Sequence, residues 1–309
     1  MKPLKIAALL LLLAALGGCA GNTARLQAVR ALSAESAKLG AFNELSQRFR
    51  DTYPREQPYL TPAADSRERQ LDAARQAAYP DFIAIENGVV LYLRALGKLA
   101  GDEQFDLEDQ VKAMKGAINA WPDSGLDDRH VNAYAGLGRL LARALTARYQ
   151  DRAVEQMLND GQDELRQLLD AMAALLRYYD KTHENEQRIV LGTLESEIPF
   201  VDNPREHLLA ALAKAHQQAK VAEYRLIGRR FTLAENNLAA LSQAHRSALQ
   251  QWQPRADGTG RDNGAGPAGA KAAHHGGMPT TADAGNTASG TTAAAPSGAV
   301  VVLPAARQP

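Results

Sequence analysis

One short segment of the chain, DKTHENE (residues 180–186), carries the side chains best suited to chemistry. Four of its residues bear carboxylate or imidazole groups, which are common ligands of divalent metal ions: Asp180, His183, Glu184 and Glu186. The segment lacks the second histidine that completes the zinc-binding helix of metalloproteases. A charged helix face exposed to solvent is therefore the favoured interpretation of this candidate surface cluster, and a weak metal site is the alternative.

The rest of the sequence holds no motif of an established catalytic site. A nucleophile elbow, a Walker phosphate loop and a dinucleotide fingerprint are all missing. The acidic segments 102–109 and 123–128 lack the spacing of a calcium loop. The chain carries 35 basic and 35 acidic residues, so no net charge attracts nucleic acid. The sequence predicts no catalytic residue, no metal, no cofactor and no nucleic-acid partner.

The single cysteine, Cys19, ends an apolar run that begins with two lysines, in MKPLKIAALLLLLAALGGCAGN. A basic start, an apolar centre and small residues are the parts of a secretory signal peptide, here residues 1–18. The cysteine and the three residues before it, Leu16, Gly17 and Gly18, resemble the lipobox of bacterial lipoproteins. The resemblance implies that Cys19 is lipidated and becomes the acylated first residue. An ordinary signal peptide with a chance cysteine is the alternative.

The lipobox resemblance also implies a location. Ala20 follows the cysteine, where an aspartate would favour retention in the inner membrane, so the expected place is the outer membrane, facing the periplasm. A covalent lipid on Cys19 would be the only attached group, and residues 19–22 would form a short tether to the domain that follows. The most apolar later stretch, residues 82–100, contains four charged or amide side chains and is expected to be a buried helix.

The apolar residues of 23–252 recur every three or four positions, and the alternation of a strand is missing, so the predicted fold is all-α. We expect helices over about 23–52, 65–78, 80–100, 107–120, 127–149 and 162–197, and a last helix from Asn203-Pro204 to about 251. The prolines of residues 54–62 are expected to form a loop, Pro80 to begin a helix, and Gly228 to interrupt the last helix.

Two apolar stripes run along the last predicted helix. The first contains Leu208, Leu212, Ala215, Ala219, Ala222 and Leu226, and the second contains Ile227, Phe231, Ala234, Leu238, Leu241 and Trp252. Steps of three and four over this length are typical of coiled-coil packing, and residues 162–197 are the expected antiparallel partner. The sequence thus predicts an elongated multi-helix bundle with a long antiparallel C-terminal helix pair. Whether that pair packs within one chain or between two chains stays open.

Residues 253–309 differ in composition from everything before them. Gly, Ala, Ser, Thr and Pro dominate, and such a segment cannot bury enough apolar surface to offset its ordering entropy. We therefore expect a disordered tail after the bundle.

These features favour a non-enzymatic function. The mature part resembles helical lipoproteins of proteobacteria whose activity is not known, and we expect a membrane-anchored periplasmic module that binds a protein partner in the envelope. An immunity or inhibitor lipoprotein that neutralises a toxin or enzyme is the alternative. A cell-wall hydrolase is a third hypothesis, which would require a cleft with converging carboxylates or histidines.

Overall fold

The computed structural model describes residues 23–101, 108–114, 117–144 and 150–252, and the fold in these residues is all-α, as predicted. They contain no strand, only one isolated bridge between Trp121 and Leu126. The predicted signal peptide (1–18), Cys19 with its tether (19–22) and the predicted tail (253–309) lie outside the described residues. None of the described helices is both long enough and apolar enough to cross a membrane.

The N-terminal part consists of several short helices before one long helix. After helical residues 23–34 come η1 (Glu35–Leu39), α2 (Gly40–Arg50), α3 (Thr52–Glu56), η2 (Gln57–Tyr59) and α4 (Pro62–Leu99). The predicted single helix 23–52 and the predicted loop 54–62 are therefore both wrong. Pro54 and Pro58 lie in the first turn of α3 and η2, where a backbone N–H has no helical partner to lose.

Helix α4 passes through Pro80 without a break, although the sequence predicts a new helix there. Ala78 and Phe82, on either side of the proline, are both buried in the same core. Because most of a helix's stability in a protein comes from such packing, it outweighs the hydrogen bond lost at one proline. The end of the helix follows the prediction, since Gly101 has the positive φ of 93° that favours glycine after a helix.

The second part of the chain contains α5 (Glu108–Ala113), η3 (Pro122–Ser124), α6 (Asp128–Ala144), α7 (Gln150–Asp160), α8 (Gln162–Val201) and α9 (His207–Trp252). Helix α5 ends before the predicted residue 120, because residues 117–120 lead into the bridge between Trp121 and Leu126. Helix α8 begins at Gln162, as predicted, and runs through Pro199 to Val201, past the predicted end at residue 197.

Helix α9 differs from its prediction at two points. It begins at His207 rather than at Pro204, because the side chain of Asn203 folds the preceding residues into a turn by hydrogen bonds with Arg205 and Glu206. It also continues through Gly228, where an interruption is expected. Gly228 is exposed, and glycine costs a helix only about 1 kcal/mol relative to alanine, which does not break it.

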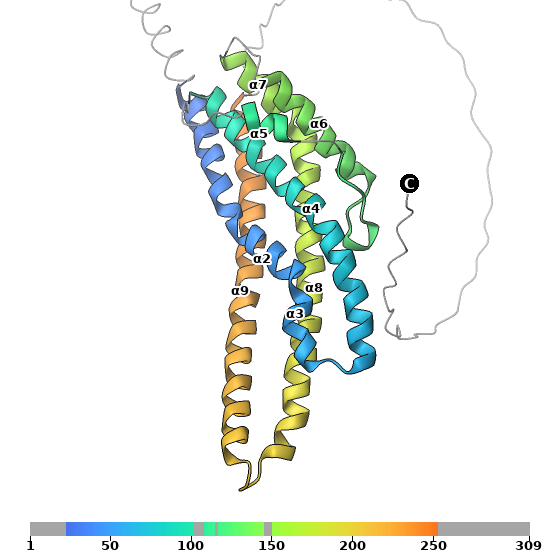
Figure 1. The fold of residues 1–309 in the computed structure, drawn as a ribbon. Coiled ribbons are helices and arrows are strands. Elements are labelled where there is room, and N and C mark those ends of the chain that lie inside the picture. The colour runs from blue at the N-terminus through green and yellow to red at the C-terminus, as the bar shows by residue number, and fades with distance from the viewer. Residues whose placement is uncertain (1–22, 102–107, 115–116, 145–149, 253–309) are drawn as a thin grey trace, which may run out of the picture. The chain divides into compact units, whose positions relative to one another are not determined.

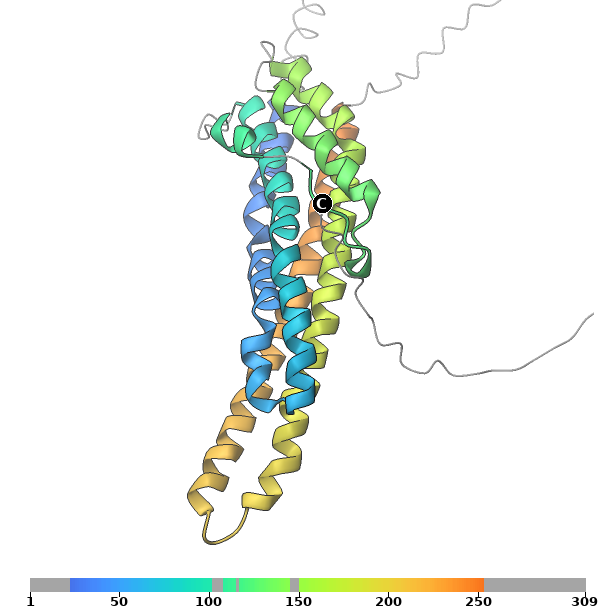
Figure 2. The same ribbon diagram turned by 45° about the vertical axis from the view of Figure 1, so that its right-hand side comes forward.

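Helices α8 and α9 form the long antiparallel pair that the sequence predicts (Figure 1). Helices α2, α4, α6 and α7 pack around one end of this pair, whereas the end near the 202–206 loop extends past all other helices (Figure 2). We call residues 227–252 the inner half of α9 and residues 207–226 its outer half. Residues 200–209, which include the 202–206 loop, are called the hairpin end.

Candidate functional site

The four residues of the predicted surface cluster do not share one environment. His183 and Glu186 are buried, with 6% and 1% of their surface exposed, whereas Asp180 is half-buried and Glu184 is exposed. The predicted solvent-exposed charged face is therefore wrong for His183 and Glu186. Among the described residues, no group of three or more histidine, cysteine or acidic side chains is placed to hold a metal ion.

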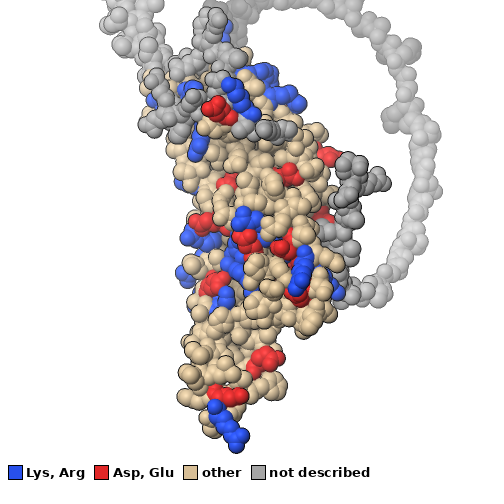
Figure 3. Space-filling view, viewed as in Figure 1, with Lys and Arg blue, Asp and Glu red and all other residues tan. Residues whose placement is uncertain are grey.

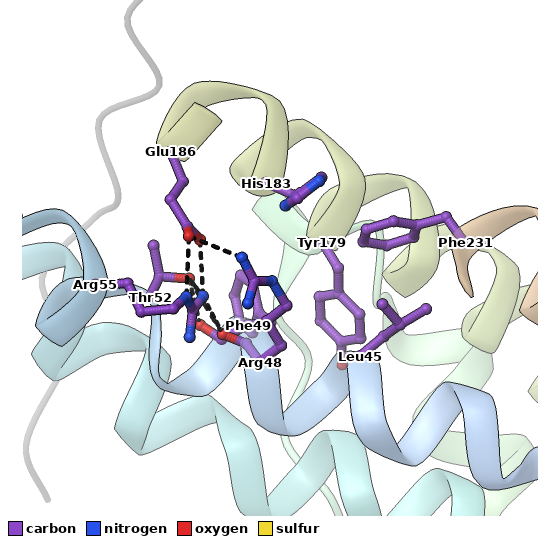
Figure 4. A pocket seen from close by; sticks show the side chains of 9 residues that line it. All are labelled: Leu45, Arg48, Phe49, Thr52, Arg55, Tyr179, His183, Glu186 and Phe231. Carbon is purple, nitrogen blue, oxygen red and sulfur yellow. Dashed lines mark hydrogen bonds and ion pairs between the residues drawn. The ribbon is translucent and has the colours of Figure 1, made fainter. Parts of the chain in front are cut away.

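Glu186 instead forms ion pairs with two arginines from the N-terminal helices (Figure 4). Arg55 of α3 holds both carboxylate oxygens, with its Nε 2.9 Å from Oε1 and its Nη2 2.7 Å from Oε2. Arg48 of α2 donates from Nη2 to Oε1 at 2.9 Å. Such a two-pronged contact between arginine and a carboxylate fixes both partners in orientation as well as in distance.

Helix α9 completes this buried network. The Arg48 Nη2 also lies 3.0 Å from Oε1 of Glu223, and the Tyr224 hydroxyl donates to Glu186 Oε1 at 3.3 Å. Glu223 is also paired with Lys220, whose Nζ lies 2.9 Å from the Glu223 Oε2, so three cationic side chains meet two carboxylates here. The network joins four helices: α2, α3, α8 and α9. Separating any of them would leave a buried charge without its partner, which is unfavourable.

The space beside the network is too small for a ligand. The cavity has a volume of about 10 Å³, which is at most the room of one water molecule (Figure 4). It is lined by Leu45, Arg48, Phe49, Thr52, Arg55, Tyr179, His183, Glu186 and Phe231. The geometry therefore favours a structural function for Glu186 over a catalytic one.

His183 lies beside the network without joining it by a hydrogen bond. Its ring is 5.4 Å from the ring of Tyr224 and 5.5 Å from that of Phe231. Burial, with the nearby charge of Arg48, lowers the pKa of His183. The histidine therefore packs as a neutral ring in the core at neutral pH.

A second group of buried charges lies where α3 meets α4. Glu68 and Arg75, both on α4, form an ion pair with Nη2 and Oε1 2.6 Å apart. Glu56, at the end of α3, is 1% exposed, and its Oε2 is buried without a hydrogen-bond partner among the described residues. Burial, together with the charge of Glu68, raises the pKa of Glu56 to about 8. Glu56 is therefore protonated in the folded protein at neutral pH.

The sequence does not identify the partners of Glu186, but it contains a signal that Glu186 is buried. Met172, Leu176, Tyr179, His183, Glu186 and Val190 follow one another in steps of three and four, and all six are buried. A glutamate at a position of an apolar stripe is a signal that it points into the core and needs a cationic partner.

The other unusual feature is the exposed side of the outer half of α9. All six residues of the first predicted stripe are exposed: Leu208, Leu212, Ala215, Ala219, Ala222 and Leu226. We call this set the outward stripe. The leucines at 208, 212 and 226 are 73%, 60% and 55% exposed, values far above those of core residues. An open hollow of about 300 Å³, lined by Gln218, Ala222 and Arg225 among others, borders the stripe.

The side of the same segment that faces α8 is more polar than the outward stripe. Gln217, Lys220 and Tyr224 are half-buried or buried there, and Tyr224 reaches the Glu186 network. Two residues that are two positions apart on a helix lie about 200° apart around its axis, which is nearly opposite. The stripe residues are two positions from the residues that face α8, namely Ala210, Gln217 and Tyr224. The outward stripe therefore points away from α8. The outer half of α9 is thus amphipathic with its apolar side facing solvent.

The hairpin end continues this apolar surface. Phe200 is 77% exposed and Leu209 is 50% exposed, while Asp202 and Lys214 form an exposed ion pair at 2.8 Å. Figure 3 shows that on the face viewed this end is largely uncharged, with a few charges of both signs near the loop. Contiguous exposed apolar patches are typical of surfaces that bind another molecule.

Comparison of the chain with known protein families, with curated proteins and with solved structures finds no match.

Proposed function

We propose that the protein is a non-enzymatic scaffold of the bacterial cell envelope, anchored in the outer membrane through a lipid on Cys19. The observation that carries the proposal is the exposed apolar hairpin end. Phe200, Leu208 and Leu209 are at least half exposed near the loop that joins α8 to α9, where no other helix of the described part of the chain covers them. Large apolar side chains held on rigid elements are suited to binding a partner protein.

The position of the hairpin end agrees with such an anchor. The guanidinium of Arg25, close to the first described residue, lies over the ring of Trp252 at 5.9 Å, so the bundle begins at the C-terminal end of α9. The 46 residues of α9 span about 69 Å to the hairpin end. A lipid on Cys19 would therefore hold one end of the bundle at the membrane and present the apolar end away from it. Such tethering would raise the effective concentration of the hairpin end near envelope partners.

The scaffold hypothesis is preferred to the inhibitor hypothesis because the face in Figure 3 mixes both signs of charge, whereas a toxin inhibitor is expected to carry a groove of one sign.

Photo-crosslinking in intact cells tests both parts of the proposal. A photoreactive amino acid replaces Phe200 in one variant and the exposed Asn236 of the inner half in a matched control. We expect adducts with another envelope protein at position 200 and none at position 236. Equal adducts at both positions would contradict binding at the hairpin end.

The anchor is tested in the same cells. With Cys19→Ala we expect the protein to leave the membrane fraction and to lose the adducts formed at position 200. A Cys19→Ala protein that still fractionates with the membrane would show that the lipid anchor is wrong.

A further inference from the structure

We propose that the outward stripe of α9 is a dimer interface, on which the same stripe of a second copy of this chain packs antiparallel around a two-fold axis. Leu208 belongs both to the stripe and to the hairpin end, but the other five stripe residues lie outside the hairpin end, so the inference does not rest on the proposed function.

The first argument is the spacing of the stripe. From Leu208 to Leu226 the steps are four, three, four, three and four, which is the a/d repeat of a coiled coil. Helix α8 does not use this repeat, because α8 packs on the opposite side of α9, against residues such as Ala210 and Tyr224. A coiled-coil seam is therefore present on α9 and has no partner helix among the described residues.

The second argument is that the stripe is complementary to itself in one register. An antiparallel coiled coil pairs an a position with a d position of the other helix. With the two-fold axis at residue 217, Leu208 packs against Leu226 of the second copy, and Leu212 packs against Ala222 of the second copy. Ala215 and Ala219 then meet near the axis, where small side chains let the two helices approach closely. Every apolar position of the stripe has an apolar counterpart.

Charge favours antiparallel over parallel pairing. Arg225 and Arg229 lie at one end of the stripe, exposed and with no ion pair among the described residues. Asp202, Arg205 and Glu206 lie at the other end, where Asp202 is paired with Lys214. Antiparallel pairing places Arg225 and Arg229 of each copy beside this end of mixed charge in the other copy. Parallel pairing would place Arg229 at a d position against the same arginine of the second copy, which like charges oppose.

The size of the stripe sets the strength of the dimer. The 18 steps from Leu208 to Leu226 span about 27 Å at 1.5 Å per residue. A seam this short, with alanine at three of its six positions, buries few large apolar side chains, which favours reversible association. We therefore expect monomer and dimer in exchange, with a dissociation constant on the order of micromolar.

Crosslinking of single cysteines tests the register. The full mature chain carrying Cys19→Ala has no other cysteine, so each added thiol is unique. Gln218→Cys lies beside the two-fold axis and should crosslink to itself with a short thiol-specific reagent. Leu226→Cys should not crosslink to itself but should crosslink when it is mixed with Leu208→Cys. Efficient self-crosslinking of Leu226→Cys would show a parallel dimer and overturn the proposal.

Sedimentation equilibrium tests the dimer without any crosslink. Two variants change an exposed alanine of α9 to the same charged residue: Ala219→Glu lies in the stripe, and Ala239→Glu lies outside it. We expect Ala219→Glu to weaken dimerisation at least tenfold and Ala239→Glu to leave it unchanged, with equal helicity by circular dichroism. A wild-type chain that stays monomeric into the hundreds of micromolar, or an Ala219→Glu protein that still dimerises normally, would overturn the inference.

The two sets of experiments can fail separately. Adducts between two copies of the chain at position 200 count for the dimer and not for the scaffold. Loss of dimerisation in Ala219→Glu without loss of heterologous adducts at position 200 would leave the proposed function standing.

Discussion

Along one unbroken helix, α9, the inner half and the outer half bury different kinds of side chain. The inner half lies against α2, α7, α8 and η1, and its apolar residues Phe231, Leu238 and Leu241 are at most 5% exposed. The outer half faces α8 with Gln217 and Tyr224 and leaves its leucines in solvent.

The difference teaches that the periodicity of a helix shows that it has an apolar side but not what covers that side. In the inner half several helices of the same chain cover it. In the outer half the charges around Glu186 occupy the side facing the chain, so the apolar side is left for another molecule. Four changes would break or sharpen this contrast, and we order them from the largest expected effect to the smallest.

The largest effect is expected from truncating one leucine in each half. Leu241→Ala removes a side chain that is 1% exposed and leaves a cavity, so we expect a loss of about 2–5 kcal/mol in the free energy of unfolding. Leu226→Ala, on the same helix but 55% exposed, should change that free energy by at most about 0.5 kcal/mol. Urea unfolding of the monomer at low protein concentration measures both. Similar losses in the two variants would show that the outer stripe is covered within the chain.

The next effect concerns the ionic network at the boundary between the halves. Glu186→Gln leaves Arg48 and Arg55 with no buried carboxylate between them, and we expect a loss of about 3 kcal/mol in the free energy of unfolding. Glu184→Gln is the matched control, because Glu184 is exposed on the same helix and should change stability by less than about 0.5 kcal/mol. Equal losses of unfolding free energy in the two variants would mean that the ion pairs of Glu186 do not stabilise the fold.

The sequence predicts much of the fold and less of the site. Helix class and the antiparallel pair follow from apolar periodicity, because packing of an amphipathic face is what stabilises such helices. The effects of Pro80 and Gly228 were overestimated, since flanking packing and helix length outweigh one weak position. The partners of Glu186 lie 131 and 138 residues away along the chain, and no local pattern specifies contacts at that separation. The lipidation of Cys19 stays a prediction.

The third change concerns two buried carboxyl groups in the part of the bundle that packs around α8 and α9: Glu56 of α3 and Glu86 of α4. The folded protein holds the pKa of Glu56 at about 8, above its ordinary value of 4.5, because burial and Glu68 disfavour the charge. Between these values Glu56 binds more protons in the folded state than in the unfolded state, so its contribution to stability should fall as pH rises through this window. His245, whose pKa burial lowers from 6.5 to about 4, acts in the opposite direction at the lower end of the window. Glu86, with its pKa raised by burial to about 6, adds to the fall over a narrower range.

Substitutions separate the contributions of Glu56 and Glu86 to this pH dependence. Glu56→Gln keeps a neutral side chain at every pH, so we expect it to flatten the fall and to stabilise the protein by about 1–3 kcal/mol at the upper end of the window. Glu86→Gln is the control, which should flatten only the part of the fall below about pH 6. Urea unfolding across the window measures both. A pH dependence that is the same in the wild type and in Glu56→Gln would contradict the assignment.

The smallest effect concerns the junction of the two halves. Gly228 has no neighbouring atom within 4 Å of the position of an added Cβ, and its helix is continuous, so Gly228→Ala should stabilise α9 by about 0.5–1 kcal/mol. Gly136→Ala is the contrasting control, since its Cβ would lie 2.8 Å from Cγ of Glu164. Hydrogen exchange of amides 215–227 should slow in Gly228→Ala, because the outer half is the part of α9 with the fewest covering helices and opens first. If Gly228→Ala destabilises the protein or leaves these amides unchanged, the glycine serves as a bend, and the outer half moves independently of the inner half.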